Sequence, residues 1–78
     1  MGMSFRVATD RAGEFVTHQQ LADELGASVQ SVRAARLDPD SPNFRRPPPS
    51  WEQALARLAR KRAAELEKLA DQLERNSS

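Results

Sequence analysis

The sequence predicts a small, mainly α-helical protein that ends in a long amphipathic helix. Residues 51–75 contain neither glycine nor proline and are rich in Ala, Leu, Glu, Arg and Lys, which all favour helix. Residues 17–36, THQQLADELGASVQSVRAAR, carry two short apolar patterns on either side of Gly26. A length of 78 residues is enough for one small domain.

The N-terminal segment is interpreted as a short β-hairpin. Phe5, Val7 and Thr9 alternate with polar residues, a period that is typical of a half-buried strand. Residues 10–13 would turn the chain, and residues 14–16 would return it as a second strand. A short helix over about the same residues is the alternative.

Thr17 is expected to begin the first helix of the central pair. Thr is a favoured N-cap, and Gln20 stands three residues later, which completes a capping box. Val16 before the cap and Leu21 inside the helix fit a hydrophobic staple. Gly26 is expected to end this helix in the left-handed conformation, which glycine adopts without a Cβ clash.

Ser28 is expected to cap a second helix over residues 28–37, with Val32 and Ala35 on its buried face. Residues 38–49 follow as a loop, because their prolines and turn formers cannot continue a helix. Ser50 is expected to cap the last helix, and the final Asn-Ser-Ser is expected to fray. We treat residues 1–50 as one functional part with a proline-rich loop, and residues 51–78 as the long helix of the same domain.

The last helix carries its apolar residues on one stripe with helical spacing. The stripe comprises Trp51, Leu55, Leu58, Arg62, Leu66, Leu69 and Leu73. The first 50 residues are too few to cover a helix of about 25 residues, which spans roughly 37 Å. The end of the stripe is therefore expected to meet another chain, with a dimer interface at Arg62, Leu66, Leu69 and Leu73.

The charges of this helix are divided along its length. Its first half is basic, whereas residues after 64 are mainly acidic. Two such helices packed antiparallel would bring opposite signs together, and Arg62 could pair with an acidic group of the partner. The orientation of a dimer nevertheless stays open, and Arg62 could equally extend its charge outward from a packed stem.

The central pair of helices resembles the helix-turn-helix superfamily of small bacterial and phage DNA-binding transcriptional regulators. The resemblance lies in QQLADELGASVQSVRAAR, about a quarter of the chain, where Leu21, Ala22, Leu25, Gly26 and Val32 occupy the packing and turn positions. Ala27 departs from the pattern, because the family usually has a larger apolar residue there. The resemblance implies a mainly α fold, a small helix-turn-helix domain followed by the long C-terminal helix.

The resemblance also implies that the helix over residues 28–37 lies in the major groove of double-stranded DNA. Carried over by position, the base-contacting residues would be Ser28, Val29, Gln30, Arg33 and Ala34. Gln30 is suited to adenine and Arg33 to guanine. Contacts to the DNA backbone would come from Thr17, Gln19, Arg36, Arg45 and Arg46. For each of these residues an ordinary surface role is the alternative, and for Val29 it is a place in the core.

The composition excludes several other classes of protein. The sequence has one His, no Cys and no phosphate-binding loop, so we do not expect an enzyme, and we expect no cofactor, metal or small-molecule substrate. No apolar run approaches the length of a membrane span, and residues 1–4 do not resemble a signal peptide, so we expect a cytoplasmic protein.

The sequence thus predicts a homodimeric transcriptional regulator, specifically a repressor of its own synthesis, whose half-sites lie about 34 Å apart. Two alternatives belong to other classes. One is a protein-interaction module, such as an antiactivator or an antitoxin-like protein, that acts through the C-terminal helix. The other is a recombination or architectural factor that bends DNA.

Overall fold

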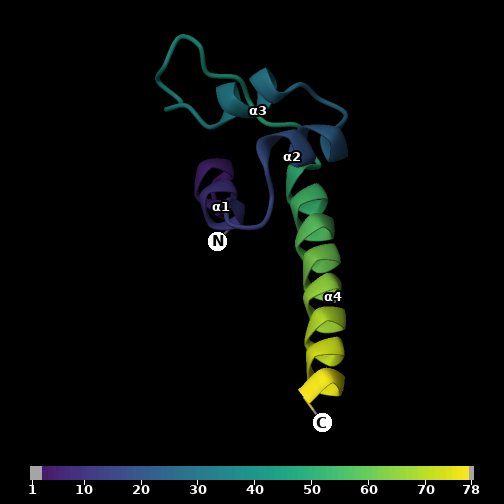
Figure 1. The fold of residues 1–78 in the computed structure, drawn as a ribbon. Helices are drawn as coiled ribbons and strands as arrows, with labels where there is room; N and C mark the ends of the chain where they lie inside the picture. Colours follow the sequence, from purple (N-terminus) through teal and green to yellow (C-terminus); the bar gives the residue numbers. More distant parts are fainter. Residues whose placement is uncertain (1–2, 78) are drawn as a thin grey trace.

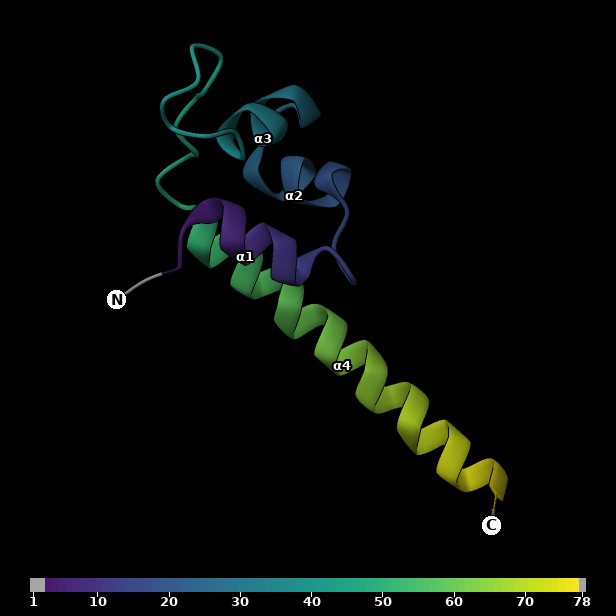
Figure 2. The same ribbon diagram turned by 90° about the vertical axis from the view of Figure 1, so that its left-hand side faces the viewer.

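A computed structural model describes residues 3–77 of the chain, which form four helices and no strand. The helices are α1 (Phe5–Ala12), α2 (His18–Leu25), α3 (Val29–Ala35) and α4 (Trp51–Ser77). α1 and α2 pack against the N-terminal half of α4, α3 packs on α2 beyond the start of α4, and the C-terminal half of α4 projects away from them (Figures 1 and 2). The molecule is therefore elongated, with extents of 57 × 26 × 17 Å.

The N-terminal hairpin is not formed, and the alternative of a short helix holds. Ser4 caps α1, and its side chain accepts a hydrogen bond from the Val7 amide at 3.2 Å. The buried residues are Phe5, Ala8, Thr9 and Ala12, which follow the i, i+3, i+4, i+7 period of a helix. Val7, which the hairpin interpretation would have buried, is 44% exposed. The alternation of Phe5, Val7 and Thr9 was misleading because small alanines supply half of the buried face.

The predicted caps and turn of the central pair are confirmed. Thr17 and Gln20 form a reciprocal capping box, with the Thr17 amide donating to Gln20 Oε1 at 2.8 Å. Gly26 has φ 67° and ψ 32°, and the Ala27 amide donates to the Ala22 carbonyl at 2.9 Å, which is a Schellman ending. Ser28 caps α3 by accepting from the Ser31 amide at 3.1 Å.

The core lies where α1, α2 and α3 meet the first two turns of α4. Leu21, Ala22 and Val32 are 1%, 0% and 2% exposed, as the crossing of α2 and α3 requires. Phe5 meets Trp51 edge to face, with ring centroids 5.2 Å apart, so α1 is joined to the start of α4. Val16 is buried beside Leu21, as predicted for the staple.

Two helix ends differ from the prediction. α3 ends at Ala35 rather than at residue 37, and Arg36 is its C-cap. α4 continues through Asn76 to Ser77, whose hydroxyl donates to the Glu74 carbonyl at 3.0 Å. Only Ser78 of the segment that was expected to fray lies outside the described residues. A helix of this length spans about 40 Å.

The two halves of α4 have different environments. Trp51, Leu55 and Leu58 pack against the core, whereas every residue from Arg60 to Ser77 is exposed. Within the described residues, no helix has the combination of length and apolar character needed to cross a bilayer.

Candidate nucleic-acid interface

The second helix of the central pair, α3, presents one face to the core and the other to solvent. Its inner face consists of Val32 and Ala35, which are buried against α2 and its neighbours. Gln30, Ser31 and Arg33 are exposed on the outer face. This division follows from the helical period once Val32 is anchored across the Gly26 turn.

Gln30 and Arg33 are available for an external ligand. Within residues 3–77, neither the Gln30 amide group nor the Arg33 guanidinium has an intramolecular hydrogen bond or ion pair. An amide and a guanidinium three positions apart lie on the same side of a helix. They therefore form a small polar surface with two different donor patterns.

The other three predicted base contacts are partly engaged elsewhere. The Ser28 hydroxyl caps α3 and also lies 2.9 Å from the Ser31 hydroxyl. Val29 is half-buried and packs against the core cluster, so its alternative role in the core holds in part. Ala34 is half-buried, and its carbonyl accepts a hydrogen bond from the Arg45 amide at 3.3 Å.

That last contact brings the proline-rich loop to α3. Arg45 and Arg46 are both exposed, and the backbone of Arg45 is attached to the C-terminal part of the helix. The Arg45 guanidinium donates to the adjacent Phe44 carbonyl at 3.0 Å, and Phe44 is half-buried. The backbone of Arg45 is thus held at Ala34, eleven positions earlier in the sequence.

Thr17 and Gln19, at the start of α2, are exposed but already have partners. The Thr17 hydroxyl accepts from the Gln20 amide at 3.1 Å, and Gln19 Nε2 donates to Asp23 at 2.8 Å. A hydroxyl that caps a helix through its oxygen still has a proton to donate. Gln19 Nε2 likewise has a second hydrogen, so both residues keep one donor for a phosphate.

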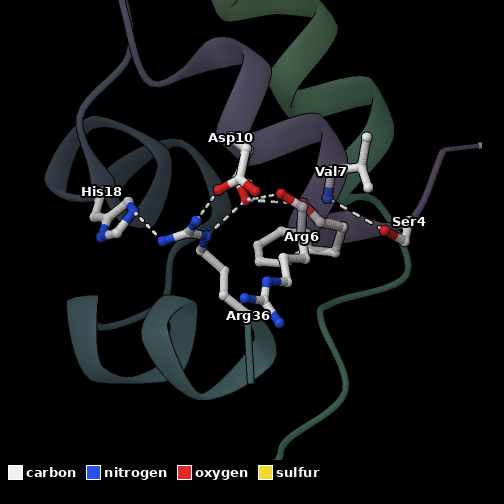
Figure 3. Close-up of polar contacts among 8 residues, drawn as sticks. Ser4, Arg6, Val7, Asp10, His18 and Arg36 are labelled. Carbon is white, nitrogen blue, oxygen red and sulfur yellow. Dashed lines mark hydrogen bonds and ion pairs between the residues drawn. The ribbon is translucent and has the colours of Figure 1, made fainter. Parts of the chain in front are cut away.

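Arg36 differs most from its predicted role as a DNA backbone contact, because its half-buried guanidinium is bound to other residues of the protein. Its Nε donates to Thr9 Oγ1 at 2.9 Å, its Nη1 lies 3.2 Å from His18 Nε2, and its Nη2 pairs with Asp10 (Figure 3). Arginine has no acceptor, so in this contact the Arg36 guanidinium donates and His18 Nε2 accepts. These four residues, named here the Arg36 cluster, join the end of α3 to α1 and to the start of α2.

Sequence reasoning did not identify the Arg36 cluster. Arg36 is 26 and 27 positions from Asp10 and Thr9, a separation over which the sequence carries no periodic signal. The buried Thr9 hydroxyl also donates to the Phe5 carbonyl at 2.8 Å. A threonine among the apolar residues of α1 is the one local sign that a polar partner was required.

The predicted dimer residues all lie on the projecting half of α4. Leu66, Leu69 and Leu73 are 51%, 49% and 56% exposed, which is unusual for three leucines on one stripe. The Arg62 guanidinium donates to Glu65 of the same helix at 3.3 Å. Nearer the core, Arg57 pairs with Glu24 at 3.1 Å and links α4 to α2.

Comparison of the chain with protein-family models, with curated proteins and with solved structures found no match. The arrangement of α2, the Gly26 turn and α3, together with its exposed polar side chains, is the feature from which a function can be argued.

Proposed function

We propose that the protein is a sequence-specific, double-stranded DNA-binding transcriptional regulator that acts as a homodimer and represses its own synthesis. The observation that carries this proposal is the outer face of α3, where Gln30 and Arg33 are exposed and have no partner within residues 3–77. The major groove admits one α-helix, so α3 could lie in it with this outer face toward the base edges.

The two side chains have the donor patterns that base edges require. An amide such as Gln30 can pair with N6 and N7 of adenine, and a guanidinium such as Arg33 can pair with O6 and N7 of guanine. Each such bidentate pair contributes about 1–3 kcal/mol of discrimination against another base.

The arginines of the loop supply the contacts that are independent of sequence. Arg45 and Arg46 are exposed beside α3, where phosphates flanking an occupied groove would lie. Arg36 is not assigned a phosphate, because its guanidinium already has three intramolecular partners. Its role in this function is to orient α3.

The experiment that tests the proposal is selection of bound fragments from a random duplex pool, followed by binding measurements on the selected site. Arg33→Ala is expected to weaken binding by about 1–3 kcal/mol and to relax the preference at one base position. Arg46→Ala is expected to weaken binding to all DNA sequences by the same factor. It should also lower the slope of log affinity against log salt concentration by about one.

The matched control is Arg60→Ala, which removes the same charge from an exposed position on α4. It should change affinity much less than either variant of the α3 surface. Failure of the wild-type protein to bind any duplex in a salt-sensitive manner would contradict the proposal. A reporter assay on the protein's own promoter then decides whether binding represses.

A further inference from the structure

The apolar stripe of α4 is covered by the protein's own helices over one half only. Trp51, Leu55 and Leu58 pack on the core, and Leu66, Leu69 and Leu73 continue the same stripe without any cover. The C-terminal half of α4 projects beyond the other three helices in Figure 1. Whatever covers the exposed half must therefore approach along residues 62–77, beyond the other three helices.

We propose that this cover is residues 62–77 of a second copy, packed antiparallel, so that the two helix-turn-helix units lie at opposite ends of the dimer. The inference deepens the homodimer of the proposed function and rests on that part of it. It does not require that the dimer binds DNA. In this arrangement Leu66 of each copy packs on Leu69 of the other.

A parallel pair is opposed by the position of the other helices. Helices in contact lie 8–10 Å apart, so two α4 helices meeting stripe to stripe would have to approach that closely. Over Trp51 to Leu58 that side is already occupied by α1 and its neighbours. In a parallel pair, the helices packed on the first half of each α4 would therefore collide and hold the two α4 helices apart where Leu66 begins the exposed stripe. In an antiparallel pair they lie at opposite ends of the dimer and do not collide.

The charges favour the same orientation. In a parallel pair in register, Arg62 within the stripe would face its own copy, and like charges across an interface are unfavourable. In the antiparallel pair with Leu66 on Leu69, Arg62 lies level with Leu73 of the partner and next to its Glu74. At this register Glu74 of each copy also lies level with Lys61 of the other, and its Glu67 lies level with Lys68, so these levels bring opposite charges together.

Phe15 lies where the other helices stop covering the apolar stripe of α4, and it offers the proposed dimer interface a contact outside α4. Its side chain lines one hollow with Ala59 and another with Leu58 and Arg62, and the residue is 38% exposed. The C-terminal end of the partner helix reaches this level in the antiparallel register. Phe15 is thus expected to pack against the partner's Leu73.

The arrangement has a consequence for the spacing of half-sites. The two Ala54 residues, at which each α4 is buried in its own domain, would be separated by 27 helical positions, or about 40 Å along the axis. α3 lies at the N-terminal end of α4, beyond that level (Figures 1 and 2). Half-sites further apart than the ~34 Å of one DNA turn are therefore expected, in place of the single-turn spacing predicted from the sequence.

The test uses the absence of cysteine, which allows single spin labels to be placed without a background thiol. Sedimentation equilibrium should show a dimer that Leu69→Glu weakens by at least about a hundredfold, whereas Ala64→Glu, on the outer face of the same helix, should weaken it less than about threefold. Phe15→Ser should weaken the dimer by about tenfold, and Val7→Ser, at another exposed apolar residue, should not.

Labels at Gln53→Cys then report the orientation. The antiparallel pair places them 29 helical positions apart, about 44 Å, while labels at Ala70→Cys should be closer than about 20 Å. A Gln53 distance below about 30 Å, or a monomer at every concentration, would overturn the inference. Because these measurements contain no DNA, their failure is distinct from failure of the proposed function, which salt-dependent duplex binding by the monomeric Leu69→Glu variant tests separately.

Discussion

Replacement of Arg36 by methionine removes the polar contacts that join α3 to α1 and α2, while it keeps most of the packed stem. The hydrogen bond to the buried Thr9 hydroxyl involves a charged donor, a type that contributes about 1.5–3 kcal/mol. The ion pair with Asp10 is more exposed, because the Arg36 and Asp10 side chains are 27% and 54% exposed, and it contributes about 0.2–1 kcal/mol. Arg36→Met should therefore lower the free energy of unfolding by about 2–4 kcal/mol.

The assay is urea unfolding followed by helical circular dichroism and by Trp51 fluorescence. It should be carried out in the Leu69→Glu background, because dimer formation would otherwise make the apparent stability depend on concentration. Thermal unfolding offers a second measurement. For a chain of this size, a loss of 1 kcal/mol in the free energy of unfolding lowers Tm by about 4–8 °C, so a loss near 2 kcal/mol is easily measured.

A double-mutant cycle with Thr9→Val separates the bond from the rest of the cluster. The valine keeps the shape of the threonine but cannot accept from Arg36 Nε, and the pair should show a coupling of about 1 kcal/mol or more. If Arg36→Met were as stable as the parent and had lost affinity for DNA alone, Arg36 would be a phosphate ligand, as the sequence predicted. A structural role for Arg36 would then be refuted.

Three further predictions concern the elements that hold α2 and α3 in place, and the same unfolding assay tests them. Gly26→Ala should lower the free energy of unfolding by about 1–2 kcal/mol because of the positive φ alone, since an added Cβ meets no atom within 4 Å. Gly26→Asn should lower it by less, because Asn tolerates this conformation better. Equal losses for the two variants would contradict a conformational cause. Val32→Ala should cost about 2 kcal/mol because the side chain is fully buried, and a loss below 0.5 kcal/mol would mean that the site collapses without a cavity. Thr17→Ala should lower the free energy of unfolding by about 1 kcal/mol, and Thr17→Ser should lower it much less, because serine retains the capping oxygen. Similar losses for the two variants would contradict a capping role.

The elements that the sequence predicted correctly are those that depend on neighbours within five positions. Thr17 with Gln20, Ser28 before α3 and Gly26 between the helices act through local hydrogen bonds and local dihedral angles. Such interactions have fixed spacings, so the sequence alone displays them. The burial of Val32 followed because the helical period leaves one choice once both caps are known.

The N-terminal helix was predicted wrongly for a physical reason that also affects the site. Half of its buried face consists of Ala8 and Ala12, which bury little area and give no strong periodic signal. Because α1 was expected to be a strand, Thr9 and Asp10 were not placed on one helical turn. Without that turn there was no reason to bring Arg36 to them, and the guanidinium was assigned to DNA.

The same error concealed how far the stripe of α4 is covered. The sequence showed that 50 residues could not cover a helix of this length, and the exposure of Leu66 to Leu73 agrees with that expectation. Where the cover ends depends on α1 and on Phe15 at its C-terminal side, which no local pattern indicates. The dimer orientation that we propose rests on that end point, so the stripe alone could not have indicated it.

The outer face of α3 is positioned by residues that lie outside that face. A helix of seven residues is too short to be stable alone, so its existence depends on its cap, on the burial of Val32 and on the contacts at its C-terminal end. At that end Arg36 holds α1 and α2, and the Ala34 carbonyl holds the loop that carries Arg45 and Arg46. Any change in these supports moves Gln30 and Arg33 together with the two loop arginines. The proposed base contacts and backbone contacts therefore depend on one shared set of intramolecular bonds, which is a physical reason for Arg36 to face inward, away from a ligand.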